Sequence, residues 1–113
     1  MSIPNKEIVG ACWELLNSVQ RHKYGANERE FLTAYQIWPI LQEEGNPICQ
    51  TITNKCGTAV GRDGGAPVGP VQRIAQALGH SDLIETHYLD TRRITIAGVR
   101  PSGSSCGLFR IRG

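Results

Sequence analysis

The segment GGAPVGPVQRIAQALG, residues 64–79, decides the fold that the sequence predicts. Pro70 has the fixed φ that suits the first turn of a helix, and we predict a helix over residues 68–79. Gly79 is placed to end this helix as a left-handed C-cap residue. Apolar side chains recur along the segment at the spacing i, i+3, i+4 and i+7, which is one face of an α-helix. These side chains are Val71, Ile74, Ala75 and Leu78.

The opposite face of this helix carries three long polar side chains, Gln72, Arg73 and Gln76. They can reach a base edge, and they are equally suited to facing water. Helical patterns precede the segment and strand patterns follow it. It is therefore predicted to be the last helix before a sheet.

The N-terminal region predicts a first helix over residues 4–23, because an apolar stripe that includes Ile8, Cys12 and Leu16 recurs at helical spacing. We interpret Cys12 as a small core residue of this helix. A short extended piece is expected at residues 31–32, before the next helix begins.

Two more helices are predicted in the middle of the chain. A capping box that starts at Thr33 predicts a helix over residues 33–44. Pro39 lies inside it and predicts a kink or a restart, because proline removes a backbone hydrogen bond. Asn46 as N-cap then predicts a short helix over residues 47–56, followed by a glycine-rich loop.

Beyond these helices the period of the pattern changes from about 3.6 to 2, which predicts strands. We predict a first strand over residues 84–88, a second at 94–96 and a third over 108–112. The last two strands, with the loop 98–107, are expected to form a hairpin whose exposed side is rich in arginine. Tyr88 is expected to be a half-buried aromatic residue of the first strand.

The predicted order gives an α+β fold in a single domain over residues 1–113. Three to four N-terminal helices precede a C-terminal antiparallel β-hairpin or three-stranded sheet. A chain of 113 residues is long enough to fold around its own apolar core without disulfides.

Composition predicts a cytoplasmic protein. No apolar run approaches the roughly 18 residues of a membrane span, and the first residues lack the pattern of a signal peptide. In a reducing compartment the cysteines are expected to be free thiols, and their spacing to one another and to the histidines does not match a zinc site. We therefore expect no metal, no cofactor and no membrane partner. The cysteines are Cys12, Cys49, Cys56 and Cys106.

The net charge of +2 hides an asymmetry along the chain. Residues 91–113 contain five arginines and no acid. A local excess of positive charge attracts phosphate groups, and arginine favours bidentate contacts with them. A solvated sheet face that keeps the protein soluble is the alternative interpretation.

The order helix, extended piece, helix, helix and basic hairpin resembles the winged helix-turn-helix superfamily. In that family the last helix before the hairpin binds in the major groove, and the hairpin, or wing, contacts the backbone or the minor groove. The resemblance implies a small protein that binds duplex DNA through a helix and an arginine-rich hairpin, for example a dimeric transcriptional regulator. The positions that correspond are Gln72, Arg73 and Gln76 on the helix, and Arg93, Arg100, Ser102, Ser104 and Arg110 on the wing.

Three alternatives stay open. The helix over residues 47–56 is a second candidate for the groove. A protein-interaction or assembly module without DNA binding, with a protein partner or a second copy of the chain, is a second function. A small enzyme that pairs Cys49, Cys56 or Cys106 with His80 or His87 is a minor third, for which no spacing selects a pair and no catalytic residue is assigned. The alternative helix carries Gln50, Thr51, Asn54 and Lys55, and the candidate interface residues are Trp13, Tyr35 and Trp38.

Overall fold

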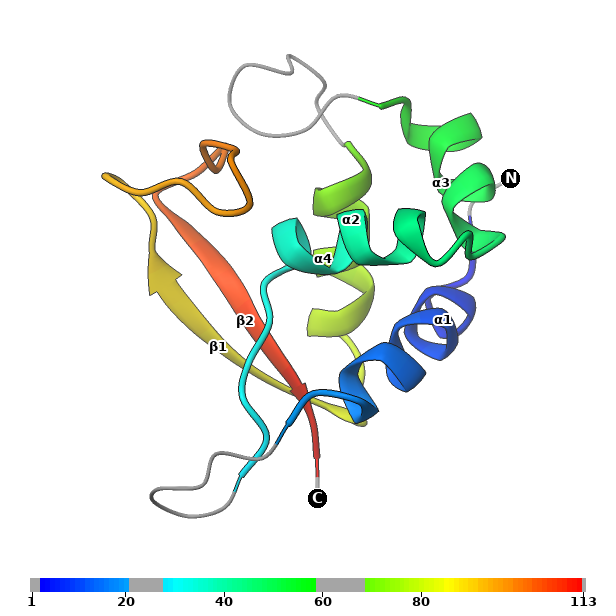
Figure 1. Cartoon of the computed structure of the whole chain (residues 1–113), viewed down its shortest axis with the longest axis horizontal. Helices are drawn as coiled ribbons and strands as arrows, with labels where there is room; N and C mark the ends of the chain where they lie inside the picture. Colours follow the sequence, from blue (N-terminus) through cyan, green and yellow to red (C-terminus); the bar gives the residue numbers. More distant parts are fainter. Residues whose placement is uncertain (1–2, 21–27, 59–68, 113) are drawn as a thin grey trace.

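Helices and strands occupy separate parts of the chain. A computed structural model describes residues 3–20, 28–58 and 69–112. Within these ranges four helices precede a two-stranded antiparallel sheet, and Figure 1 shows the sheet to one side of the helices. The predicted α+β class is confirmed, and none of these helices is long and apolar enough to cross a membrane. The elements are α1 (Asn5–Asn17), α2 (Ala34–Glu43), α3 (Ile48–Cys56), α4 (Pro70–Gly79), β1 (Ile84–Asp90) and β2 (Ser105–Ile111).

The first helix is shorter than predicted. α1 ends at Asn17 with Ser18 as its C-cap, whose backbone N–H donates to carbonyls of the last turn and whose hydroxyl donates to the carbonyl of Leu15 at 2.6 Å. Arg29 lies beside this end, and its Nη1 donates to the carbonyl of Asn17 at 2.7 Å. A cation there complements the negative end of the helix dipole. The predicted helical residues 21–23 lie outside the described ranges.

Thr33 caps α2 as predicted. The N–H of Gln36 donates to the Thr33 hydroxyl at 3.3 Å, and the N–H of Thr33 donates to Gln36 Oε1 at 2.8 Å.

Pro39 does not end this helix, so the predicted restart is wrong. Proline removes only one backbone bond, and the capped first turn together with the fully buried Ile37 and Leu41 stabilises the rest.

α3 begins at Ile48, one residue after the predicted start, and its N-cap is Pro47, so the prediction of Asn46 as N-cap is wrong. Asn46 Oδ1 nevertheless accepts the N–H of Ile48 at 3.0 Å. α4 begins at Pro70, but Gly79 is still helical and is not a left-handed C-cap, so that prediction is wrong; His80 follows as the C-cap with φ −95°. Residues 64–68 of the deciding segment lie outside the described ranges.

α4 is the central helix of the core. It packs against the other three helices and both strands. Its predicted apolar face is buried, with Ile74 and Leu78 fully inaccessible, although Ala77 is buried more deeply than Ala75. Burial of one large aliphatic side chain contributes roughly 1.5–3 kcal/mol, so this face is a main source of stability. Cys12 is fully buried in α1, and its predicted core role is confirmed.

The two strands pair directly with each other. The register places Ile84 opposite Ile111 at one end and Asp90 opposite Ser105 at the other. Residues 91–104 connect them and form no strand, so the predicted second strand and its hairpin are wrong. We call this connection the arginine loop. In Figure 1 it lies at the end of the sheet that is far from the C-terminus.

The extended piece before α2 joins this sheet, as a short strand-like contact. Leu32 and Phe109 form an antiparallel bridge in which each N–H donates to the other's carbonyl, at 2.9 and 2.8 Å. The extended piece predicted at residues 31–32 is therefore present. It links the helical part of the chain to its last strand.

The helices cover only one end of the sheet. Ile84 and Phe109 are 2% exposed, whereas Tyr88, on the same face by strand alternation, is 76% exposed. The prediction of a half-buried Tyr88 is wrong, because this part of β1 extends past the helical layer. Gly107 lies opposite Tyr88, and the ring of Phe109 packs so closely over Gly107 that an added Cβ would overlap it.

Candidate nucleic-acid interface

The arginine loop is anchored at its base by Thr91. The N–H of Thr91 donates to the carbonyl of Ser104 at 3.0 Å, and its hydroxyl donates to the carbonyl of Gly103 at 2.9 Å. Thr91 is only 2% exposed, so these bonds are shielded from water. The loop is therefore closed directly above the last paired residues of the sheet.

A tight turn shapes the middle of the loop. The N–H groups of Ile96 and Val99 each donate to the other's carbonyl, at 2.8 and 3.0 Å. Between them Ala97 and Gly98 have φ of 52° and 78°. Positive φ at both central residues is typical of a type I′ turn. This turn explains why isoleucines alternate at positions 94 and 96 without forming a strand.

Three arginines surround one hollow of the loop. Arg92, Arg93 and Arg100 are exposed and line a volume of about 380 Å³. Arg92 also forms an ion pair with Asp90 at 2.6 Å, and this hydrogen bond raises the pKa of Arg92 and lowers the pKa of Asp90. Arg93 has no acidic partner among the residues that the structure describes. Guanidinium groups gathered in this way attract an anion.

Four of the five predicted wing residues lie in this loop and one does not. Arg93, Arg100, Ser102 and Ser104 are exposed on the arginine loop. Arg110 lies in β2, and its side chain is only 14% exposed. We therefore leave Arg110 out of the candidate interface.

Arg110 is held by acids of its own chain. Its Nη2 lies 2.8 Å from Glu85 and 2.9 Å from Glu28, and its guanidinium carbon lies 4.3 Å from the centre of the Phe31 ring. The Glu85 hydrogen bond raises the pKa of Arg110. In return the hydrogen bonds from Arg110 and then from His87 lower the pKa of Glu85. At this position the predicted exposed arginine face is wrong, because the cross-strand residue is a glutamate.

The candidate residues of α4 do not share one open face. Nε2 of Gln72 donates to the hydroxyl of Ser102 at 2.8 Å, so Gln72 lies against the arginine loop. Arg73 donates to the carbonyl of Ile3 and is directed to the N-terminal segment. Of the three, only Gln76 is exposed, and Gln72 and Arg73 are half-buried.

The alternative helix α3 is the more exposed of the two. All four of its candidate side chains are exposed, and Gln50 donates to Asn54 at 2.7 Å along the helix. However, α3 packs on the other helices and contacts neither strand. Figure 1 places it across the molecule from the arginine loop. The other two candidates of this helix are Thr51 and Lys55.

Two of the three predicted interface aromatics are core residues. Tyr35 and Trp38 of α2 are 5% and 4% exposed, so they are not available as interface anchors. The Tyr35 hydroxyl accepts the N–H of Ser102 at 2.9 Å, which ties α2 to the arginine loop. Trp13 is 39% exposed and stays a candidate.

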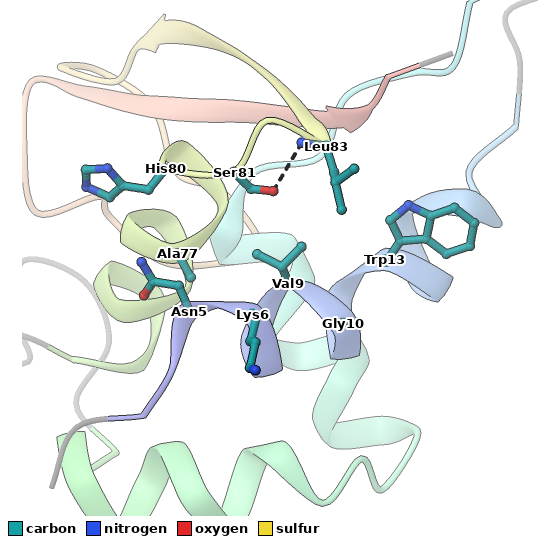
Figure 2. A pocket seen from close by; sticks show the side chains of 9 residues that line it. All are labelled: Asn5, Lys6, Val9, Gly10, Trp13, Ala77, His80, Ser81 and Leu83. Atoms are coloured by element: carbon teal, nitrogen blue, oxygen red, sulfur yellow. Dashed lines mark hydrogen bonds between the residues drawn. The ribbon is translucent and has the colours of Figure 1, made fainter.

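Trp13 borders an open groove between α1, α4 and the start of β1. The groove has a volume of about 470 Å³, and Leu83 on its rim is 59% exposed. Figure 2 shows Val9 and Leu83 converging at its centre, Trp13 at one end and His80 at the other. The hydroxyl of Ser81 accepts the N–H of Leu83 at 3.2 Å and so orders the turn that presents this leucine.

Three of the four thiols lack the environment of an activated nucleophile. Burial raises the pKa of Cys12 to about 12, with a smaller contribution from Cys49. Burial also raises the pKa of Cys49 and of Cys106. All four cysteines are free, and within the described ranges no three Cys, His, Asp or Glu residues gather as a metal site. His87, proposed as a base, hydrogen-bonds Glu85 at 2.8 Å instead of a thiol.

Sequence reasoning missed three exposed side chains of these surfaces. Arg92 is adjacent to Arg93 in the sequence, and this doublet was a usable signal. Tyr88 was not recognisable, because the strand pattern predicts it to be half-buried, and Leu83 lies just before the predicted strand, where no pattern indicates its exposure. Comparisons of the chain with protein-family models, with curated proteins and with solved structures found no match.

Proposed function

We propose that this protein is a small DNA-binding protein that holds the phosphate backbone of duplex DNA with its arginine loop. The observation that carries the proposal is the group of Arg92, Arg93 and Arg100 around one exposed hollow. Arginine forks match the geometry of phosphate oxygens and bind them bidentately. Asp90 pairs with Arg92, and residues 91–113 contain five arginines and no acid.

DNA bound at the arginine loop would contact α4 as the next element of the protein. The Gln72–Ser102 hydrogen bond joins the arginine loop to the first turns of α4, and Gln76 is exposed one turn further along. α3 contacts neither strand, which favours α4 over α3 as the neighbour of the loop. The resemblance to winged helices supports the same choice, since there the last helix before the hairpin enters the groove.

A salt series on a labelled random duplex tests this proposal by fluorescence anisotropy. Binding should weaken with salt, with a log–log slope of about −0.9 for each phosphate contacted. The double variant Arg93→Ala/Arg100→Ala should reduce the magnitude of that slope by roughly 1 to 2. The matched control is Arg112→Ala, because Arg112 donates to the carbonyl of Asp82 at the opposite end of the sheet.

Two outcomes would refute the proposal. One is an absence of duplex binding at about 50 mM salt, where phosphate contacts are strong. The other is a loss of affinity in the double variant that is no larger, per arginine removed, than the loss in Arg112→Ala. An equal loss per arginine would assign the binding to overall charge and not to the loop.

Self-association is a second candidate function, favoured by the groove beside Trp13. A twofold dimer uses the same patch on both subunits. Trp13 and Leu83 are exposed on the rim of this groove, and in such a dimer they would pack into the groove of the second copy. Sedimentation equilibrium should then show a dimer at micromolar concentration that Trp13→Ala weakens at least about tenfold. A wild-type chain that stays monomeric at high concentration would exclude it.

A further inference from the structure

A second hollow lies beside the arginine loop, between α4, α2 and the uncovered end of the sheet. Its volume is about 220 Å³. Pockets for drug-sized ligands usually have 300–1,000 Å³, so this one suits roughly a single ring system. Tyr35, Gln72, Ala75, Tyr88 and Ser102 are among the residues that line it.

Tyr88 is the most exposed large side chain of this hollow. It is 76% exposed, although it shares its sheet face with the buried Phe109. Its cross-strand partner Gly107 has no side chain that would cover the ring. An aromatic ring presented in this way is the usual platform on which an unpaired base stacks.

Gln72 supplies an unpaired polar group to the same place. Its Nε2 donates to the hydroxyl of Ser102 at 2.8 Å, whereas its buried Oε1 has no hydrogen-bond partner among the described residues. A buried acceptor without a donor is unfavourable, and a turn of the Gln72 amide toward the hollow would let Oε1 accept an N–H from a ligand there. Nucleobases carry such N–H groups on their edges.

The hollow and the arginines adjoin along the chain. Pro101 and Arg100 line the arginine hollow, and the next residue, Ser102, lines this one. A nucleotide chain whose phosphates lie at the arginines therefore has its bases within reach of Tyr88.

We propose that this hollow receives one unpaired base of a DNA strand, stacked on Tyr88, with the Gln72 amide turned so that its Oε1 accepts an N–H of the base. The proposal rests on the DNA binding proposed above for the arginine loop, and it adds a preference for DNA that contains an unpaired base. The arginines hold the strand, and Tyr88 distinguishes unpaired from paired DNA.

The test compares a labelled single strand with a duplex of the same sequence at one low salt concentration. Three proteins are measured: the wild type, Tyr88→Leu and Tyr88→Phe. The wild type should bind the single strand more tightly than the duplex. Tyr88→Leu should lose roughly 5- to 100-fold in affinity for the single strand, which is the range of base–aromatic stacking. Tyr88→Phe keeps the ring and should stay within about twofold of the wild type.

Two readouts separate this proposal from the first one. Tyr88→Leu should leave the salt slope and the duplex affinity unchanged, because Tyr88 contacts no phosphate. In a strand with one 2-aminopurine, stacking should quench the fluorescence in the wild type and not in Tyr88→Leu. If Tyr88→Leu binds the single strand as the wild type does, the base site is refuted while phosphate binding by the arginines stands. If neither single strand nor duplex binds, both proposals fail.

Discussion

Nε2 of Gln72 in α4 donates a 2.8 Å hydrogen bond to the hydroxyl of Ser102, thirty residues further along the chain. The N–H of Ser102 in turn donates to the hydroxyl of Tyr35 in α2 at 2.9 Å. Through Ser102 the arginine loop is therefore bonded to two helices of the core. A loop held at such a point presents its arginines from a defined position, which lowers the entropy lost on binding a phosphate.

The Tyr35 hydroxyl is expected to contribute measurably to stability. Tyr35→Phe keeps the buried ring but leaves the N–H of Ser102 without its acceptor, which should lower the free energy of unfolding by about 1 kcal/mol. Urea denaturation at constant pH measures this loss. The matched control is Tyr88→Phe at an exposed tyrosine, which should change stability by less than about 0.5 kcal/mol. Equal effects of the two variants would contradict the role of the Tyr35–Ser102 bond.

Gly107 is expected to tolerate no side chain. A Cβ there would overlap the ring of Phe109, and since that ring lies in the core it cannot move away freely. Gly107→Ala should therefore destabilise the protein by about 1–3 kcal/mol, as overpacking does. Gly10→Ala is the contrasting variant, because nothing lies within 4 Å of the new methyl group and alanine is the better helix former. It should stabilise the protein by roughly 0.5–1 kcal/mol. Thermal denaturation of both variants distinguishes these opposite signs.

Patterns within one element predicted the local structure well. Thr33 and Pro70 each start a helix as expected, because a helix start depends on residues only a few positions away. A similar local pattern, helical spacing of apolar residues, indicates that Trp38 is a core residue and not an interface anchor. Ala34, Trp38 and Leu41 recur at i, i+4 and i+7 and lie on one buried face of α2.

Positions that depend on partners far along the chain were not predictable from one sequence. Arg110 lies on the other side of β2 from Phe109, as strand alternation requires, yet nothing local indicates that Glu85 lies opposite it. The site has the same limit. Gln72 and Ser102 were each candidates, but their contact depends on how α4 packs beside the sheet. A strand of three residues also cannot be told from a turn, as the bridge between Ile96 and Val99 illustrates.

Ala97 is expected to be a strained position of the arginine loop. Its φ of 52° lies in the left-handed region, which costs a residue with a Cβ about 1 kcal/mol. Ala97→Gly should therefore stabilise the protein by up to about 1 kcal/mol, reduced by the greater freedom of glycine in the unfolded chain. Ala97→Val should destabilise it, because a β-branched side chain is the least suited to positive φ. A shift of the urea midpoint at unchanged m-value measures both, and a stability gain from valine would contradict the assignment of strain.

Glu85 is expected to make stability fall in acid. Its pKa is lowered by the hydrogen bond from Arg110 first and that from His87 second, while Glu28 shares Arg110 from the other side. The unfolded chain, with an ordinary glutamate pKa of about 4.3, takes up a proton before the folded chain does. This contribution is therefore fully present above that value and is lost as the pH falls through the lower folded pKa. Denaturation between about pH 6 and pH 3 should show a shallower decline for Glu85→Gln than for the wild type. Glu14→Gln, at an exposed position of α1, is the control and should follow the wild-type curve. If Glu85→Gln also follows that curve, the ion pair with Arg110 does not stabilise the fold.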